Sequence, residues 1–111
     1  MMPADIIKGE TPGEGEKMNA SNVYCFPNPS SGKTTLRFTI AEPETVRIDI
    51  YDIDMDLVWH RDLNAAEVRA GANYIEWNGQ NGTDVDAANG VYLFRIQTGE
   101  KIIIKKIVII K

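Results

Sequence analysis

Reactive side chains are scarce in this sequence, which contains one cysteine and one histidine among its 111 residues. Cys25 therefore has no partner for an internal disulfide, and its apolar neighbours in residues 23–26 favour the role of a small buried hydrophobe. His60 lies in a different predicted strand, and no motif links it to Cys25. Because catalysis needs a nucleophile, a base and an orienting group together, we predict a protein that is not an enzyme and needs no cofactor.

The sequence also lacks a long hydrophobic run and an excess of positive charge. Its longest apolar run, residues 107–110, is far shorter than a membrane span and is bounded by lysines. Residues 1–17 contain prolines, glycines and acids where a signal peptide would have an apolar segment. Sixteen acidic against twelve basic residues give a formal charge of −4, which argues against nucleic acid or an anionic membrane as a partner. We therefore predict no membrane insertion and no nucleic-acid binding.

Turn-forming residues and short apolar segments are abundant. Nine glycines and five prolines in a chain of this length favour many turns over long helices. Between the turns, seven segments have strand character: residues 23–26, 34–40, 45–51, 57–63, 73–77, 91–98 and 102–110. Residues 64–70, the one segment with helix propensity, are too short to form more than a turn. Because crossover helices are missing, the pattern predicts an all-β fold with two antiparallel sheets packed as a sandwich.

Alternation along the strands predicts which side chains form the core. It places six apolar residues inside, namely Leu36, Phe38, Ile40, Val46, Ile48 and Ile50. We add Trp77, Val91 and one of Leu93 and Phe94 to this core.

The same alternation makes three further predictions. It turns Asp49 toward solvent, together with its strand neighbours Arg47 and Tyr51. Residues 57–63 alternate less cleanly, which indicates a bulge. In the final strand Lys105 and Lys106 interrupt the isoleucines, so one lysine faces inward unless the strand bulges there.

The first residues differ in composition from the rest of the chain. Residues 8–17 mix glycine, proline and charge with almost nothing to bury. We predict a flexible tail or linker over residues 1–22 and one sandwich domain over residues 23–111. Such a beginning is expected of a piece cut from a larger protein, or of a short protein with a loose arm.

Two acidic loops have a spacing of oxygen ligands that calcium could use. The first contains Asp52, Asp54 and Asp56, but leucines stand where a calcium-binding loop has its glycine and its bidentate glutamate. The second, before residue 90, contains Asn81, Asp84 and Asp86. The alternative for both loops is ordinary turn chemistry, in which Asp and Asn side chains bond their own backbone. We predict no metal site and keep these six residues as calcium candidates.

Two further ligand classes have partial signals. Residues 31–34, Ser-Gly-Lys-Thr, imitate the end of a phosphate-binding loop, but Pro27 stands where its first glycine belongs and a strand replaces the required helix. We therefore predict no nucleotide binding. Four aromatic residues could form a platform for sugar rings, namely Trp59, Tyr74, Trp77 and Tyr92. Core packing is the commoner use of tryptophan in such sandwiches, so carbohydrate binding stays an alternative.

Five short motifs, in chain order, carry a family resemblance: Phe26-Pro27-Asn28-Pro29, Ile50-Tyr51-Asp52, Gly71 with Glu76-Trp77-Asn78-Gly79, Gly90-Val91-Tyr92, and the final Lys105-Lys106-Ile107-Val108. Together they resemble the small immunoglobulin-like C-terminal domains that act as type IX secretion sorting domains, and the similar immunoglobulin-like domain of the flagellar hook-capping protein. The resemblance covers residues 23–111. Family members commonly have a glycine where this chain has Met55-Asp56, which implies a longer or reshaped hairpin there.

The resemblance implies an immunoglobulin-like (fibronectin-III-like) β-sandwich and a non-catalytic module of a larger secreted or surface bacterial protein. For a sorting domain it implies recognition by an outer-membrane secretion machine and transfer of the parent protein to the cell surface. We expect the partners to be the secretion machinery or neighbouring domains of the parent chain. We expect a sorting receptor to bind the folded module through Lys105, Lys106 and Lys111. The alternatives are a hook-cap-type assembly domain and a carbohydrate- or calcium-binding accessory module. A signal peptide and an enzyme or adhesin domain upstream would favour sorting.

Overall fold

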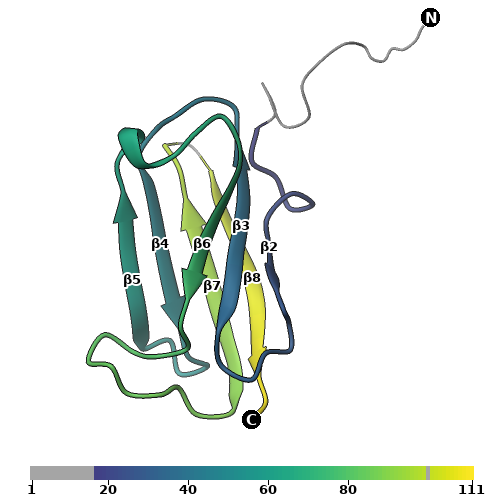
Figure 1. Ribbon diagram of the computed structural model, residues 1–111, viewed down its shortest axis with the longest axis vertical. Helices are drawn as coiled ribbons and strands as arrows, with labels where there is room; N and C mark the ends of the chain where they lie inside the picture. Colours follow the sequence, from purple (N-terminus) through teal and green to yellow (C-terminus); the bar gives the residue numbers. More distant parts are fainter. Residues whose placement is uncertain (1–16, 100) are drawn as a thin grey trace, which may run out of the picture.

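The fold is a sandwich of two antiparallel sheets, as the computed structural model shows for residues 17–99 and 101–111 (Figure 1). Seven strands are described: β2 (Tyr24–Phe26), β3 (Thr34–Ile40), β4 (Val46–Tyr51), β5 (Leu57–Leu63), β6 (Gly71–Trp77), β7 (Gly90–Gln97) and β8 (Ile102–Ile109). One sheet has the order β2-β3-β6 and the other the order β5-β4-β7-β8. The predicted all-β, immunoglobulin-like sandwich is confirmed.

Local irregularities follow the expected residues. Residues 64–70 contain a single turn of 3-10 helix, Ala65–Glu67, which Asn64 caps by accepting the Ala66 N–H at 2.9 Å. The predicted bulge is present in β5, because Ile50 pairs with Trp59 while Tyr51 pairs with Leu57 and leaves Val58 as the extra residue.

The core contains the residues that alternation selected, with one correction. Trp77, Phe94 and the six residues of β3 and β4 are at most 1% exposed. Val91 is 36% exposed, so its predicted core position is wrong. Residues 91–94 are all apolar or aromatic, so the sequence has no polar–apolar alternation there to show which of these side chains face the core. Because the inward side chains of β7 are Tyr92, Phe94 and Ile96, Val91 points outward.

The last strand places a lysine on its inward face. β8 pairs with β7 in one continuous register, from Gly90–Ile109 to Gln97–Ile102, without a bulge. Lys105 therefore shares a face with Ile107 and Ile109, which are both 0% exposed. Lys105 lies at the margin of the sandwich, where its stem is half-buried and its amine donates a hydrogen bond to the Ala20 carbonyl.

The packed part of the chain begins before the first strand. Residues 1–16 of the predicted tail lie outside the described residues. Met18 is 2% exposed and belongs to the core cluster. A turn follows it, in which the Asn22 side-chain amide donates to the Lys17 carbonyl at 2.8 Å. Residues 17–22 therefore lie against the sandwich.

Two of the motif positions have a backbone explanation. Gly79 has φ +81°, and a Cβ atom there would lie 2.6 Å from the carbonyl carbon and oxygen of Gly32, so only glycine fits. Met55 has φ 67°, the left-handed conformation that a glycine adopts without strain. The turn between β4 and β5 thus forms with methionine in the conformation that favours glycine.

Deleting residues 101–111 should abolish folding. The deletion removes Ile107 and Ile109 and exposes the side chains that they cover, and each buried aliphatic side chain contributes about 1.5–3 kcal/mol. Small domains are stable by roughly 5–15 kcal/mol in total. Circular dichroism should therefore show a disordered chain without a cooperative thermal transition.

Matched double substitutions within β8 provide the control. Ile107→Ser with Ile109→Ser should unfold the domain, whereas Ile102→Ser with Ile104→Ser should leave the fold intact, because Ile102 and Ile104 are 50% and 56% exposed. A cooperative transition in the deletion variant would contradict this prediction.

Candidate functional site

The outer edge of β8 is covered in part by the segment formed by residues 26–30. Asn28 does this with its side chain: its Nδ2 donates to the Lys106 carbonyl at 2.8 Å and its Oδ1 accepts the Val108 N–H at 2.9 Å. Ser30 continues the pairing with its backbone, donating to the Val108 carbonyl and accepting the Ile110 N–H, both at 2.8 Å. Residues 28–30 therefore act as a short partner strand for the second half of β8.

The residues that imitate a phosphate-binding loop support this segment. The Ser30 hydroxyl accepts the Gly32 N–H at 2.9 Å, and the Thr34 hydroxyl donates to the Pro27 carbonyl at 2.8 Å. The Lys33 amine lies 3.5 Å from the Glu76 carboxylate. β3 follows directly, so this turn has no helix N-terminus of the kind that holds phosphates.

The three lysines proposed for partner binding do not form one patch. The Lys105 amine is bound to the Ala20 carbonyl, and the Lys111 amine donates to the Ala87 carbonyl at 2.5 Å. Lys106 points to the opposite face of β8 from Lys105 and is exposed. Its side chain makes no hydrogen bond or ion pair with the described residues. Partner binding by these lysines stays a prediction.

The first calcium-candidate loop is a closed turn. Asp52 Oδ1 accepts the N–H groups of Asp54 and Asp56 at 2.9 and 3.0 Å, and the Asp52 carbonyl accepts the Met55 N–H. Asp54 and Asp56 are exposed. This is the turn chemistry named as the alternative.

The second loop is built in the same way. Asn81 Oδ1 accepts the N–H groups of Thr83 and Val85 at 2.8 and 3.0 Å, while Asp86 accepts the Gln80 side-chain amide at 3.2 Å. Asp84 has φ 65° at the turn. Across residues 17–99 and 101–111, no group of three or more His, Cys, Asp or Glu side chains is placed to hold a metal ion.

The aromatic residues considered as a sugar platform lie in different parts of the molecule. Trp77 and Tyr92 are core residues in edge contact, with ring centroids 5.9 Å apart. The Tyr92 hydroxyl donates to the Ala88 carbonyl at 2.7 Å, and burial raises the pKa of Tyr92. Trp59 is half-buried, and Tyr74 is exposed on the other sheet. These four side chains therefore do not form one platform.

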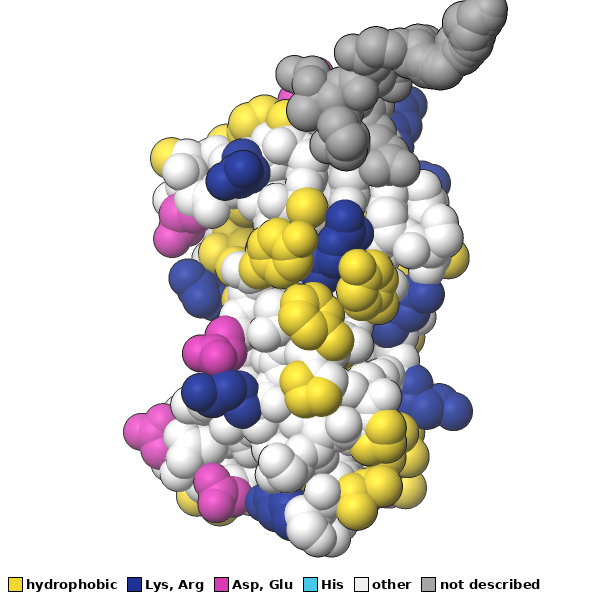
Figure 2. Space-filling view, turned by 45° about the vertical axis from the view of Figure 1, so that its right-hand side comes forward, with side chains coloured by type: hydrophobic (Ala, Val, Ile, Leu, Met, Phe, Trp, Pro, Cys, Tyr) yellow, Lys and Arg dark blue, Asp and Glu magenta, His cyan; other side chains and the backbone are white. Residues whose placement is uncertain are grey.

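A different aromatic group is exposed on the three-stranded sheet. The Phe26 ring lies 6.0 Å from the Tyr24 ring and 6.3 Å from the Tyr74 ring, measured between centroids. The Arg37 guanidinium lies over Tyr24 at 5.2 Å. Figure 2 shows hydrophobic side chains gathered beside Lys and Arg side chains on this side of the molecule. The sequence did not reveal this group, because strand pairing brings Tyr24 and Tyr74 to either side of Arg37.

A cluster of charged and polar side chains around the buried Asp49 carboxylate lies on the outer face of the four-stranded sheet, and it corrects the prediction that Asp49 faces solvent. The Asp49 side chain is 1% exposed. Its Oδ1 lies 2.6 Å from His60 Nδ1, and its Oδ2 accepts hydrogen bonds from Arg95 at 3.2 Å and from Arg47 at 3.3 Å. Asp49 does point away from the core, but the side chains of Arg47, His60 and Arg95, from β4, β5 and β7, cover it.

His60 joins two carboxylates in this cluster. Its Nε2 lies 3.0 Å from Asp62 Oδ2, on the side opposite Asp49. The hydrogen bond to Asp49, followed by the one to Asp62, raises the pKa of His60 above its ordinary value. The interaction was not predictable from spacing, because strand register alone places His60 and Arg95 directly opposite Asp49.

Cys25 and His60 lie in different sheets as well as in distant parts of the sequence. Cys25 lies in β2 of the three-stranded sheet and is 8% exposed, whereas His60 lies in β5 of the other sheet. Burial raises the pKa of the Cys25 thiol to about 12. A thiol with this pKa is not a nucleophile at neutral pH.

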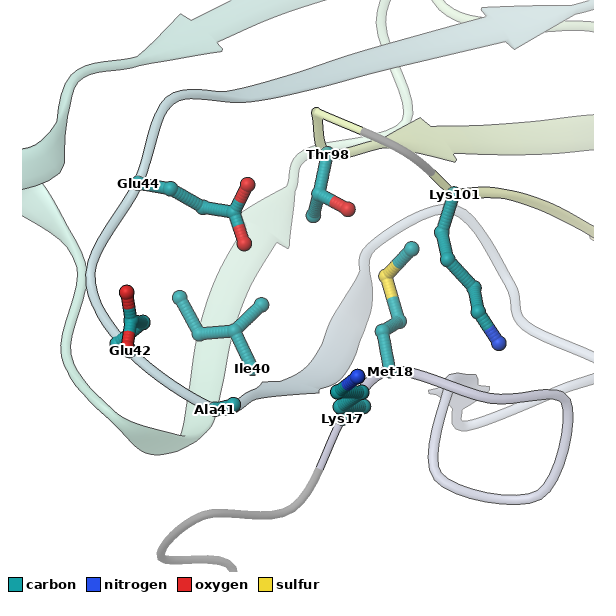
Figure 3. Close-up of a pocket in the computed structure, with 8 residues that line it drawn as sticks. All are labelled: Lys17, Met18, Ile40, Ala41, Glu42, Glu44, Thr98 and Lys101. Carbon is teal, nitrogen blue, oxygen red and sulfur yellow. The ribbon is translucent and has the colours of Figure 1, made fainter.

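A shallow hollow of about 400 Å³ lies at the end of the sandwich where the loop between β7 and β8 turns (Figure 3). Met18 and Ile40 form part of its wall, with Glu44 and Lys101 at its margin. The Glu44 carboxylate accepts the Gly99 N–H at 3.0 Å and so fixes the neighbouring loop. Apolar side chains and charges of both signs therefore line the hollow.

Residues 24–110 match the model of the secretion system C-terminal sorting domain family. The chain belongs to this family. The fold of this sorting domain is similar to part of dimeric latent PorU from Porphyromonas gingivalis, with a TM-score of 0.64 and 25% identity. That similarity covers 79% of this chain and 9% of PorU.

Two further solved structures share the fold. PorZ, described as an essential surface component of the type IX secretion system of P. gingivalis, has a TM-score of 0.56 and 17% identity over 82% of this chain and 12% of its own. FlgD from P. aeruginosa has a TM-score of 0.50 and 20% identity over 82% of this chain and 70% of its own. Comparison with curated proteins gave no match. Among the described residues, no helix has the length and apolar character needed to cross a membrane.

Replacing Asn28 should loosen the last strand of the sorting domain. Asn28→Ala removes both side-chain hydrogen bonds to β8, and we expect a loss of roughly 1–3 kcal/mol in the free energy of unfolding. Asn28→Asp keeps the acceptor for Val108 but sets an oxygen against the Lys106 carbonyl, so it should destabilise at least as much. Urea unfolding measures the change. Asn78→Ala is the control, because Asn78 bonds only nearby Gln80, and equal losses for both alanine variants would contradict the prediction.

The His60 interaction should make stability depend on pH. A raised pKa in the folded state means that the folded domain holds the His60 proton more tightly than the unfolded chain, where histidine titrates near about 6.5. The resulting stabilisation is complete below about pH 6.5 and disappears as pH rises through the folded-state pKa. The difference in melting temperature between wild type and His60→Gln should therefore be larger at about pH 6 than at about pH 9.

Arg61→Gln provides the control for this measurement. Arg61 is an exposed neighbour on β5, and a guanidinium stays charged over this pH range. Its effect on the melting temperature should be the same at both pH values. A His60→Gln difference that stays constant or grows with pH would show that the charged form of His60 is not the stabilising one.

Proposed function

We propose that this sorting domain is a non-catalytic sorting signal within a larger exported bacterial protein. The type IX secretion machinery recognises the domain and transfers the parent protein to the cell surface. The family match over residues 24–110 is the observation that carries this proposal. The similar regions amount to 9% of PorU and 12% of PorZ, so domains of this fold occur as small parts of long chains.

The arrangement of reactive groups supports a non-catalytic role. The Cys25 thiol is buried in one sheet, and His60 is held between two carboxylates on the other. A nucleophile and a base within hydrogen-bonding reach of each other are the minimum for covalent catalysis, and this pair is separated by the sandwich. With these two groups apart, we infer that the described part of the module acts through its surface and its shape.

Recognition by a receptor would use the folded surface around β8. Of Lys105, Lys106 and Lys111, the first and third have amines bound to main-chain carbonyls. Lys106 presents its charge on the outer face of the sheet, where a partner reaches it without breaking an internal contact. We therefore assign Lys106 the largest role among the three lysines in receptor binding.

Export of a reporter tests this proposal. An exported reporter fused to the chain should reach the cell surface of a type IX-competent host, and removing the domain should abolish this. Lys106→Gln should reduce export while leaving the melting temperature nearly unchanged, because exposed charges contribute little to stability. Lys33→Gln, at an exposed lysine immediately before β3 of the other sheet, is the matched control and should export normally. Export that survives both Lys106→Gln and removal of the domain would refute the sorting role.

A hook-cap-type assembly role is the second candidate, and the similarity to FlgD over 70% of that chain favours it. That similarity, at 20% identity, concerns the fold. In this role the domain would contact neighbouring subunits of an oligomer, and removing it would leave export unchanged. The reporter experiment therefore separates the two functions.

A further inference from the structure

The first half of β8 has a row of outward main-chain groups. The N–H and C=O of Val108 point away from β7, because they bond Asn28 and Ser30. Main-chain direction alternates along a strand, and β8 pairs with β7 without interruption. The N–H and C=O groups of Ile102 and Ile104, and the N–H of Lys106, therefore point to the same open edge.

These main-chain groups lie in the part of β8 that the segment of residues 26–30 does not pair with. The segment of residues 26–30 bonds β8 from the Lys106 carbonyl onward, toward Ile110. Among the described residues, no hydrogen bond is made to the outward main-chain groups of Ile102 and Ile104. An edge of this kind is a template on which another extended chain pairs.

The side chains beside this edge indicate what would pair there. Ile102 and Ile104 are 50% and 56% exposed, which is unusual for isoleucine in a strand and gives an added strand apolar contacts on the outer face. Lys106 follows them on the same face. Residues 101–111 contain four lysines and no acidic residue, so a second copy of this edge would bring only further positive charge to it. An acidic segment would instead place carboxylates beside Lys106.

We propose that the open half of β8 accepts an extended segment of a partner protein as an added strand. The segment pairs with the main chain at Ile102, Ile104 and Lys106, places aliphatic side chains beside the two isoleucines, and places an acidic side chain beside Lys106. Resting on the proposed function, the partner is a component of the secretion machinery. Lys106 then selects the partner by charge while the main chain supplies the pairing.

Ile104→Pro isolates the main-chain contribution. Proline at this position removes an outward N–H to which none of the described residues bonds, and proline is tolerated on edge strands when its N–H side faces away from the sheet. Ile104→Ala is the matched variant, because it removes the side chain and keeps the N–H. Melting temperatures of both variants establish that the domain stays folded.

The probe is a short acetylated peptide of alternating Glu and Val, compared with one of alternating Lys and Val. The acidic peptide should slow hydrogen exchange of the Ile102, Ile104 and Lys106 amides by at least about tenfold, as detected by NMR. The basic peptide should not. Ile104→Pro should abolish the protection, and Ile104→Ala should only weaken it.

Three results would overturn the proposal: no protection of these amides by the acidic peptide, equal protection by the basic peptide, or protection that persists in folded Ile104→Pro. Protection without peptide that rises with protein concentration, together with a dimer mass in light scattering, would assign the edge to a second copy instead. Because this measurement does not involve export, its failure is distinguishable from failure of the sorting role in the reporter experiment.

Discussion

The last strand must satisfy two physical demands at once, and the rest of the structure is arranged around them. Its inward isoleucines, Ile107 and Ile109, have to be covered by the core, and its outward main-chain groups have to be paired or left to solvent. β7 and the opposite sheet meet the first demand. Asn28 and Ser30 meet the second for half of the strand, so a loop close to the start of the sandwich fixes its final strand.

The motifs that identify the family are mainly structural devices. Asn28 pairs with β8, Trp77 fills the core and donates its indole N–H to the Gln80 carbonyl at 2.8 Å, and Gly79 lets the backbone approach Gly32. Such positions accept few substitutions, whereas exposed strand positions accept many. The fold is shared with part of PorU at 25% identity.

Charge acts differently in the middle of the four-stranded sheet and at its β8 edge. On its outer face, His60, Arg47 and Arg95 surround Asp49, and a buried carboxylate of this kind is tolerated because every charge near it is paired or hydrogen-bonded. The cluster joins β4, β5 and β7 through side chains, in addition to their backbone pairing. At the β8 edge, by contrast, Lys106 is exposed. A folded module with this distribution offers a partner a rigid edge and a local positive charge.

The sequence by itself determined the fold class, most strand positions, the inward faces of β3 and β4 and the family, because period-two alternation and turn residues act locally. It did not determine the face of Val91, the burial of Asp49 or the separate positions of Lys105, Lys106 and Lys111. These depend on register, and register is set by contacts between residues far apart in the chain: Asp49 is buried because His60 and Arg95 lie opposite it. The open half of β8 is likewise a tertiary property, because it exists only where the cover provided by Asn28 and Ser30 ends.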